Sequence, residues 1–314
     1  MIFNTTGFVR NDFAVAGISW TPCYVLLGNA GPVLFESGFS YAGKLYEDDI
    51  RRFAGESGNS EPKYLFLTHV HYDHCGATSY LKQKFSGLKV AASARAHDLI
   101  NKQNILDLIK NLSANAAVVG ESLPDIDTSR FLRETFEPFS IDIIVKDGDR
   151  IQIEDNLTIE VIASPGHTRD MLSYYVPEKK ILIATEACGC MDRAGTIITE
   201  FLSDYNSYMD SLRRLANLDA EILCQGHHFV YAGAGEVRNF FSRSIKEACN
   251  FKDRVFELLS KKNGDIKEAI RIIKAEQYDT NTKIKQPEKA YLLNLNAQVE
   301  HLAKLFLGAN NPHS

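Results

Sequence analysis

The sequence lacks several features that would place it in large classes of proteins. No run of about 18 apolar residues occurs in its 314 residues, so no membrane-spanning helix is predicted. Its first residues carry no basic segment followed by an apolar one, so we expect no secretory leader and a cytoplasmic location. Binding of nucleic acid needs a basic face, and the balance of 35 basic against 40 acidic residues, with a net charge of −5, argues against it. We therefore expect neither a membrane nor a nucleic acid as partner.

Two further absences concern chemistry. No Gly-x-Ser-x-Gly sequence is present, so a serine nucleophile is not suggested. The six cysteines show no regular framework of a small secreted fold, which favours reduced thiols. Cys188 and Cys190 flank one glycine shortly after Glu186. The simpler interpretation is that both cysteines are small residues that line a loop. The alternative is that they bind a metal ion.

Histidine is scarce, yet three of the nine histidines lie within six positions. His69, His71 and His74 are joined there by Asp73. A lone histidine is usually a surface or satisfied core residue, but a cluster this dense is costly to bury without compensation. His69 and His71 can point the same way from an extended loop, whereas Asp73 and His74 begin the next turn and aim at a second point. The spacing predicts a site for a pair of divalent cations.

Short apolar runs place this cluster and three further polar residues at the ends of strands. The run 63–68 precedes the cluster. Three later runs each end in a histidine or a carboxylate: 157–163 before His167, 180–185 before Glu186, and 221–224 before His227. Singly, these residues could be a turn residue, a helix-capping acid and a surface histidine. Because α/β proteins commonly place chemistry at strand ends, we predict that they complete the metal site.

The order of these residues resembles the metallo-β-lactamase-fold hydrolases over roughly residues 15–235. It comprises His-x-His-x-Asp-His, then Gly-His, then an acid after a strand, then a second Gly-His. The resemblance implies two ligand sets, which are His69, His71 and His167 for one ion and Asp73, His74 and His227 for the other. Glu186 stands where the family usually has an aspartate that bridges both ions. Since glutamate is one methylene longer, it either bridges after a small backbone shift, binds one ion, or misses both.

The resemblance also implies an α+β fold, a four-layer αβ/βα sandwich, and the chain's alternation of β-rich and helical runs agrees with it. We assign residues 1–235 to this catalytic domain. In residues 236–314 apolar residues recur every three or four positions in three segments, which predicts an all-helical C-terminal cap. The cap either covers the metal cleft and lines an acyl pocket or forms a homodimer face. A helical stretch at 94–111 is a lid in one interpretation and a patch on the sandwich edge in the other.

The expected cofactors are two divalent metal ions, with zinc first and iron or manganese as alternatives. A hydroxide bridging the two ions is the expected nucleophile, and Asp73 is the residue expected to orient it and pass on its proton.

The run 68–76 and the helical C-terminus are similar to the quinolone-signal thioesterase-like branch, which acts on 2-aminobenzoylacetyl-CoA. We therefore expect a metal-dependent hydrolase of a small-molecule thioester of the acyl-CoA type. A lactonase or other ester hydrolase is the nearest alternative. A metal-bearing regulatory protein that binds a partner through its helical tail is the alternative from another class.

Overall fold

The computed structural model describes residues 1–56, 61–120, 128–133, 136–280 and 286–310. Its body consists of two seven-stranded sheets. In spatial order, the first sheet contains β2 (Gly7–Arg10), β3 (Phe13–Ala16), β4 (Cys23–Gly28), β5 (Gly31–Phe35), β6 (Tyr64–Phe66), β7 (Lys89–Ser93) and β8 (Ile143–Val145). The second contains β1 (Ile2–Phe3), β16 (Val230–Ala232), β15 (Ile222–Cys224), β12 (Ile181–Ile183), β11 (Leu172–Val176), β10 (Leu157–Ala163) and β9 (Arg150–Glu154). A two-stranded ribbon, β13 (Cys190–Met191) and β14 (Ile197–Ile198), stands apart from both.

Central strands are buried on both faces, which explains why they read as short apolar runs. In β4, Tyr24 and Leu26 belong to the core between the sheets. The alternate residues Cys23, Val25 and Leu27 face the outer helices instead. This period of two follows from the pleat of the strand, and each face buries its own apolar set.

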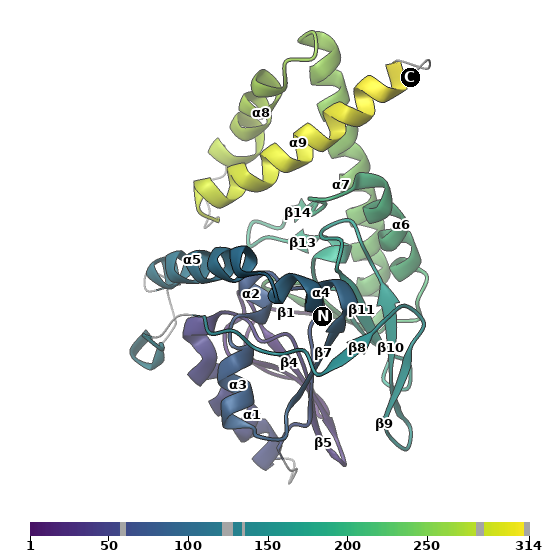
Figure 1. Ribbon diagram of the computed structural model, residues 1–314. Coiled ribbons are helices and arrows are strands. Elements are labelled where there is room, and N and C mark those ends of the chain that lie inside the picture. Colours follow the sequence, from purple (N-terminus) through teal and green to yellow (C-terminus); the bar gives the residue numbers. More distant parts are fainter. Residues whose placement is uncertain (57–60, 121–127, 134–135, 281–285, 311–314) are drawn as a thin grey trace.

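Helices cover the outer face of each sheet. The first sheet packs against α1 (Gly43–Glu56), α3 (Thr78–Lys84), α4 (Ala94–Ile100) and α5 (Gln103–Gly120), and the second against α6 (Tyr205–Ala216) and α7 (Ala234–Lys261). The layers are therefore helix, sheet, sheet and helix, as the predicted α+β sandwich requires (Figure 1). The predicted helix at 94–111 is in fact two helices, interrupted at Asn101 and Lys102. Of these, α5 contacts both the one-turn helix α2 (Tyr72–Cys75) and the 3-10 turn η1 (Ser40–Ala42), which places it over the histidine-rich run.

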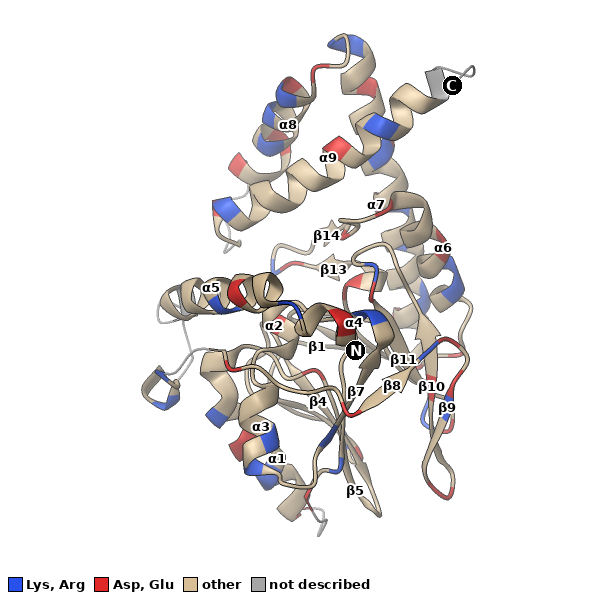
Figure 2. Ribbon diagram, viewed as in Figure 1, with Lys and Arg blue, Asp and Glu red and all other residues tan. Residues whose placement is uncertain are grey.

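The C-terminal segment is helical, as expected, and comprises α7, α8 (Ile266–Lys274) and α9 (Glu288–Asn310). Figure 1 shows α8 and α9 extending beyond the end of the sandwich, and their outer faces carry charges of both signs (Figure 2). The inner faces of α8 and α9 join the core of the second half through residues such as Ile273 and Leu302. On α7, Phe240 joins the same core and lies 4.5 Å from Tyr231 between ring centroids. The predicted domain boundary at 235/236 falls in the first turn of α7, and residues on both sides of it share one hydrophobic cluster. No helix in the described part of the chain is long and apolar enough to cross a membrane.

Two leucines on α9 offer a matched test of this packing. Leu302 is 0% exposed in the shared core, whereas Leu307 on the same helix is 57% exposed. We expect Leu302→Ala to lower the free energy of unfolding by about 2–5 kcal/mol, because it removes buried methyl groups and leaves a cavity. Leu307→Ala should change it by no more than about 0.5 kcal/mol. Urea unfolding followed by circular dichroism measures both, and equal effects would show that α9 does not pack as described.

Candidate metal centre

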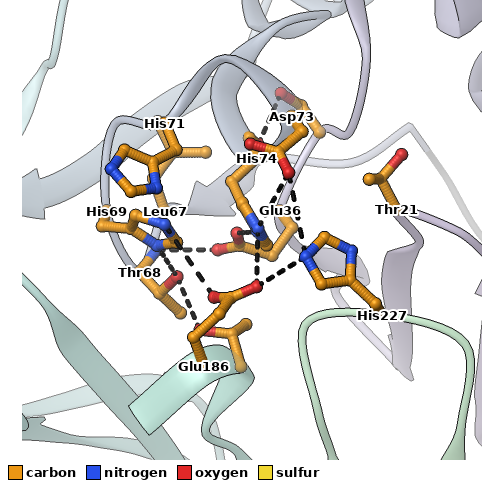
Figure 3. Close-up of polar contacts among 12 residues, drawn as sticks. Thr21, Glu36, Leu67, Thr68, His69, His71, Asp73, His74, Glu186 and His227 are labelled. Carbon is orange, nitrogen blue, oxygen red and sulfur yellow. Dashed lines mark hydrogen bonds and ion pairs between the residues drawn. The ribbon is translucent and has the colours of Figure 1, made fainter. Parts of the chain in front are cut away.

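The histidine-rich run changes backbone conformation at His71. The run follows β6, and the Thr68 amide donates to Oε1 of Glu36 over 2.7 Å. His71 is extended, with φ −72° and ψ 148°, and the helix α2 starts at the next residue. The residues before His71 therefore present their side chains from an extended loop, while Asp73 and His74 project from the first turn of a helix (Figure 3).

The structure brings six of the predicted ligands together as two triplets. In each triplet the potential ligand atoms all lie within 4.8 Å of one another. The first triplet is His69, His71 and His167, and the second is Asp73, His74 and His227. These are the two sets that the resemblance implied, and the loops that supply them come from both sheets.

Glu186 lies between the two triplets (Figure 3). Its Oε1 is 2.9 Å from Nε2 of His74 and 3.0 Å from Nε2 of His227, and its Oε2 is 3.8 Å from Nε2 of His69. The residue sits in the 3-10 turn η3 (Thr185–Cys188), which follows β12. A Cβ at Gly226 would stand 1.8 Å from Oε1, so the lack of a side chain there leaves room for the carboxylate. The longer acid therefore stays within reach of both triplets.

Protein oxygens hold the outward nitrogens of three of the imidazoles. Nδ1 of His74 is 2.6 Å from Oε2 of Glu36, Nδ1 of His227 is 2.6 Å from the Trp20 carbonyl oxygen, and Nδ1 of His167 is 2.5 Å from the Glu200 carbonyl oxygen. Carboxylate and carbonyl oxygens only accept here, so Nδ1 carries the proton in each ring. Each Nε2 then turns its lone pair toward the centre, which is the arrangement of a metal-binding histidine.

Two buried groups at the centre lack a hydrogen-bond partner. They are Nε2 of His69 and both carboxylate oxygens of Glu186, in residues that are 0% and 2% exposed. Neutral rings protonated at Nδ1 cannot donate to Glu186 through their facing Nε2 atoms, and a buried charge without a donor is costly. Cations between the triplets would satisfy both groups, so the residues fit a pair of divalent ions.

The titration behaviour of the rings points the same way. Burial, followed by the neighbouring imidazole of His71, lowers the pKa of His167 to about 4, so this ring is neutral at physiological pH. Burial also lowers the pKa of His227, but hydrogen bonding to Glu186, followed by the charge of Glu186, outweighs it and raises that pKa to about 9. Without a metal, a proton on His227 would partly neutralise Glu186. A divalent ion would take over that role.

Glu36 is a further acid at the centre that the sequence did not lead us to predict. This residue follows β5 at a φ of +64° and is 1% exposed, and one of its carboxylate oxygens holds His74 while the other holds the Thr68 amide. It thus positions both the histidine-rich loop and one of its rings. The signal that identified Glu186, an acid at the end of a strand-like run, is present at Glu36 too, because Glu36 follows the apolar residues 33–35.

Gly166 sets the direction of His167. Its φ is +133°, and a Cβ there would approach backbone atoms of Tyr208 to 2.3–2.4 Å. The close approach brings the Gly166 carbonyl to the start of α6, where it accepts from the Ser203 amide over 3.0 Å. The alternative of a cysteine ligand finds no support in the described residues, because Cys188 donates its thiol hydrogen to the Thr185 carbonyl and neither Cys188 nor Cys190 belongs to a potential ligand group.

Curated relatives share part of this chain. The hydroxyacylglutathione hydrolase GloC of Haemophilus influenzae is 28% identical over 176 residues, which are 55% of this chain and 72% of that protein. A hydroxyacylglutathione hydrolase of Trichormus variabilis is 25% identical over 254 residues, which are 79% of this chain and 80% of that protein. The beta-lactamase-like protein 2 homolog of Caenorhabditis elegans is 27% identical over 171 residues, and the match spans only 44% of its length.

Solved structures agree in fold. A metallo-beta-lactamase family protein from Thermus thermophilus superposes with a TM-score of 0.59 at 18% identity, covering 99% of this chain and 93% of that one. An archaeal superfamily protein from Sulfolobus tokodaii gives a TM-score of 0.56 at 16% identity, covering 98% and 97%. The family model described as the metallo-beta-lactamase superfamily matches residues 21–227, a span that holds all seven predicted ligands. Since this match covers more than half of the sequence, the chain belongs to the metallo-beta-lactamase superfamily.

Proposed function

We propose that the protein is a dinuclear metal-dependent hydrolase that acts on a thioester. The observation that carries the proposal is the convergence of two ligand triplets on Glu186, a buried carboxylate without a hydrogen-bond donor. One ion would be held by His69, His71 and His167, the other by Asp73, His74 and His227, and Glu186 would be shared. Neutral imidazoles with two carboxylates suit zinc, with iron and manganese as alternatives.

The centre has a closed side and an open side. His69, His74 and Glu186 are at most 2% exposed, whereas the side chains of Asp73 and His227 are 15% and 27% exposed. His71 is partly exposed as well, so substrate would enter past the side of the centre that carries His71, Asp73 and His227. Divalent ions bound at the centre would supply a water deprotonated near neutral pH and would polarise a carbonyl group. Asp73, on the open side and 3.8 Å from Nε2 of His227, would orient that water and accept its proton.

Two considerations favour a thioester. The names of the Haemophilus and Trichormus relatives describe hydrolysis of an acyl group carried by glutathione, a thiol. A thiol with a pKa of about 8.5 leaves without much help from an acid, so Asp73 could serve as a base alone. The acyl-CoA substrate expected from the sequence is also a thioester, with coenzyme A as the thiol in place of glutathione.

The flank beside Asp73 would receive the acyl group. Phe39 lies 5.0 Å from Tyr41 and 5.9 Å from Tyr72 between ring centroids. Tyr41 and Tyr72 both feel the charge of Asp73, which contributes to raising their phenol pKa values above the ordinary range. These rings form an apolar wall beside Asp73, in which Phe39 and Tyr41 are buried and Tyr72 is partly exposed, and α5 lies over the turn and helix that carry them. We propose that this wall, with α5 as a cover, binds the acyl half of the substrate.

A regulatory role through partner binding is the second candidate. Leu293 and Leu307 on α9 are 66% and 57% exposed, which fits a surface for a partner or for a homodimer. Asp73→Ala separates the two candidates. Loss of both hydrolysis and the cellular phenotype supports the enzyme, whereas a phenotype that survives loss of hydrolysis supports the binding role.

The first prediction concerns metal content. His69→Ala and His74→Ala should each lose most of the bound metal and nearly all hydrolysis of an acyl-glutathione or acyl-CoA thioester, since each removes a ligand from a different triplet. His97→Ala, on α4 outside both triplets, is the matched control and should keep its metal. Elemental analysis of purified protein measures this. Full metal in either site variant would contradict the ligand assignment.

The second prediction separates the charge of Glu186 from its position. Glu186→Gln removes the charge, and Gly226→Ala displaces the carboxylate through the new Cβ. We expect both changes to lower hydrolysis roughly 100-fold or more, as loss of a principal electrostatic group commonly does. In Glu186→Gln the His69–His71–His167 triplet should lose its ion first, because it then keeps only neutral ligands.

Gly235→Ala is the control for the glycine change, because a Cβ at Gly235 meets nothing within 4 Å. Metal titration of all three variants, with circular dichroism as a check on folding, tests the idea. Wild-type metal affinity in both Glu186→Gln and Gly226→Ala would rule out Glu186 as a shared ligand.

The third prediction concerns Glu36. Glu36→Gln should weaken metal binding about 10–100-fold, the usual effect of losing a group that orients a ligand. The amide can accept from His74 or from the Thr68 amide but not from both, because its nitrogen only donates. Glu47→Gln, whose carboxylate pairs with Arg51 and Tyr80 on α1 and α3, is the control. Equal metal affinities in the two variants would mean that Glu36 serves the fold alone.

A further inference from the structure

A second cleft lies beside the metal centre, on the far side of His227. Its volume is about 470 Å³, and it is lined by Asn4, Thr5, Arg193, His228 and Phe229. His227 and His228 are consecutive, and their ring centroids are 6.3 Å apart. His228, which lines the cleft, thus directly follows His227 at the exposed edge of the metal centre.

The cleft is lined by one cationic side chain, Arg193, that forms no ion pair with the described residues. Arg193 is exposed, on the turn between β13 and β14, and no carboxylate in the described part of the chain pairs with it. The neighbouring Asp192 is engaged elsewhere, because its Oδ1 accepts from the amides of Ala194 and Thr196 over 2.8 and 2.9 Å. No other residue lining the cleft is a lysine, arginine, aspartate or glutamate.

The ring of Trp20 lies against this cation. The Arg193 guanidinium carbon lies 5.4 Å from the centroid of the Trp20 ring, and the Trp20 ring is 5.1 Å from that of His228. Trp20 in turn is tied to the metal centre, because its carbonyl oxygen accepts from His227. A guanidinium placed over a ring keeps its N–H groups free at the edge for an anionic ligand.

His228 adds a second sign of a binding site. Its φ is +65°, a conformation that non-glycine residues rarely adopt, and the Ser19 carbonyl holds its amide at 2.7 Å. Its Nδ1 is buried without a hydrogen-bond partner. The chain thus holds this ring in a strained backbone, with a polar atom that has no partner inside the protein.

We propose that this cleft binds an anionic group on the thiol half of the substrate, with Arg193 as the residue that determines specificity. The inference rests on the proposed thioester hydrolysis. The two flanks of the open side differ in character, since Phe39, Tyr41 and Tyr72 offer an apolar wall and the cleft offers a cation with the amide of Asn4 and the hydroxyl of Thr5. A thioester placed between them lays its acyl half on the rings and its charged thiol half on Arg193. Carboxylates and phosphates both satisfy this chemistry.

Three substrates with one acyl group test the proposal on the metal-loaded full chain. S-acetylglutathione carries carboxylates, acetyl-CoA carries phosphates, and S-acetyl-N-acetylcysteamine is neutral. We expect Arg193→Ala to lower the ratio of kcat/KM for the anionic to the neutral thioester roughly tenfold, mainly through KM, as loss of one charged contact commonly does. Arg193→Lys should restore part of the ratio. Arg238 is an exposed arginine on α7 outside the cleft. Arg238→Ala removes the same charge as Arg193→Ala and should leave the ratio of kcat/KM values unchanged.

The pattern across substrates identifies the anion. A fall for S-acetylglutathione alone assigns the cleft to a carboxylate, and a fall for acetyl-CoA alone assigns it to a phosphate. An unchanged ratio for both in Arg193→Ala overturns the proposal.

A binding measurement keeps the cleft separable from catalysis. Trp20 is the only tryptophan of the chain, so its fluorescence reports on the cleft directly. S-methylglutathione and coenzyme A should change this fluorescence in the wild type at concentrations at least tenfold lower than in Arg193→Ala. If the wild type hydrolyses none of the three thioesters, the proposed function fails. The fluorescence titration then decides independently whether the cleft binds anions. No Arg193-dependent change with either probe would refute it.

Discussion

A buried carboxylate among imidazole nitrogens is the constraint on which this site depends. Glu186 is enclosed at 2% exposure with no donor of its own, and nitrogens of His69, His74 and His227 surround it at 2.9–3.8 Å. Neutral rings that turn lone pairs toward a carboxylate cannot stabilise it, so positive charge has to come from protons or metal ions. The outward hydrogen bonds of the rings are arranged for metal ions. The oxygen atoms that accept from Nδ1 fix the ring proton there, which leaves the lone pair of each Nε2 free to bind a metal ion.

The two sheets hold this arrangement together through hydrogen bonds between the loops at their ends. The Thr68 carbonyl accepts from the Leu172 amide over 2.9 Å, and the Leu67 carbonyl accepts from the Tyr174 hydroxyl over 2.7 Å. Both contacts join the histidine-rich loop of the first sheet to β11 of the second. Since the triplets draw on loops from both sheets, any slip between the sheets would pull the ligands apart. The packed core between the sheets is what keeps the distances fixed.

The sequence alone was enough to predict the features that local patterns encode. The dense His-x-His-x-Asp-His run, the strand ends before Glu186 and His227, and the apolar periodicity of residues 236–314 are all local signals. The three periodic segments are found as α7, α8 and α9. Glu36 also ends a strand-like run, but no histidine stands near it in the sequence, and only its contact with His74 in the folded chain reveals its role. The Arg193 cleft was missed for the same reason. Its lining comes from residues 4–5, 193 and 228–229, which only the tertiary fold brings together.

The difference in exposure among the ligands assigns them different duties. His69, His74 and Glu186 are closed to solvent, so in the proposed centre they would define positions that do not change during a reaction. Asp73 and His227 stand at the edge and are the ligands that a substrate can pass. Asp73 has an apolar aromatic wall beside it, and His227 is followed directly by a residue of the cleft that holds a cation. The metal ligands that would act on the scissile bond thus also mark the border between two surfaces of opposite character. Those surfaces would align any molecule whose reactive carbonyl joins an apolar half to an anionic half before the reaction begins. This alignment would not require the buried ligands to move.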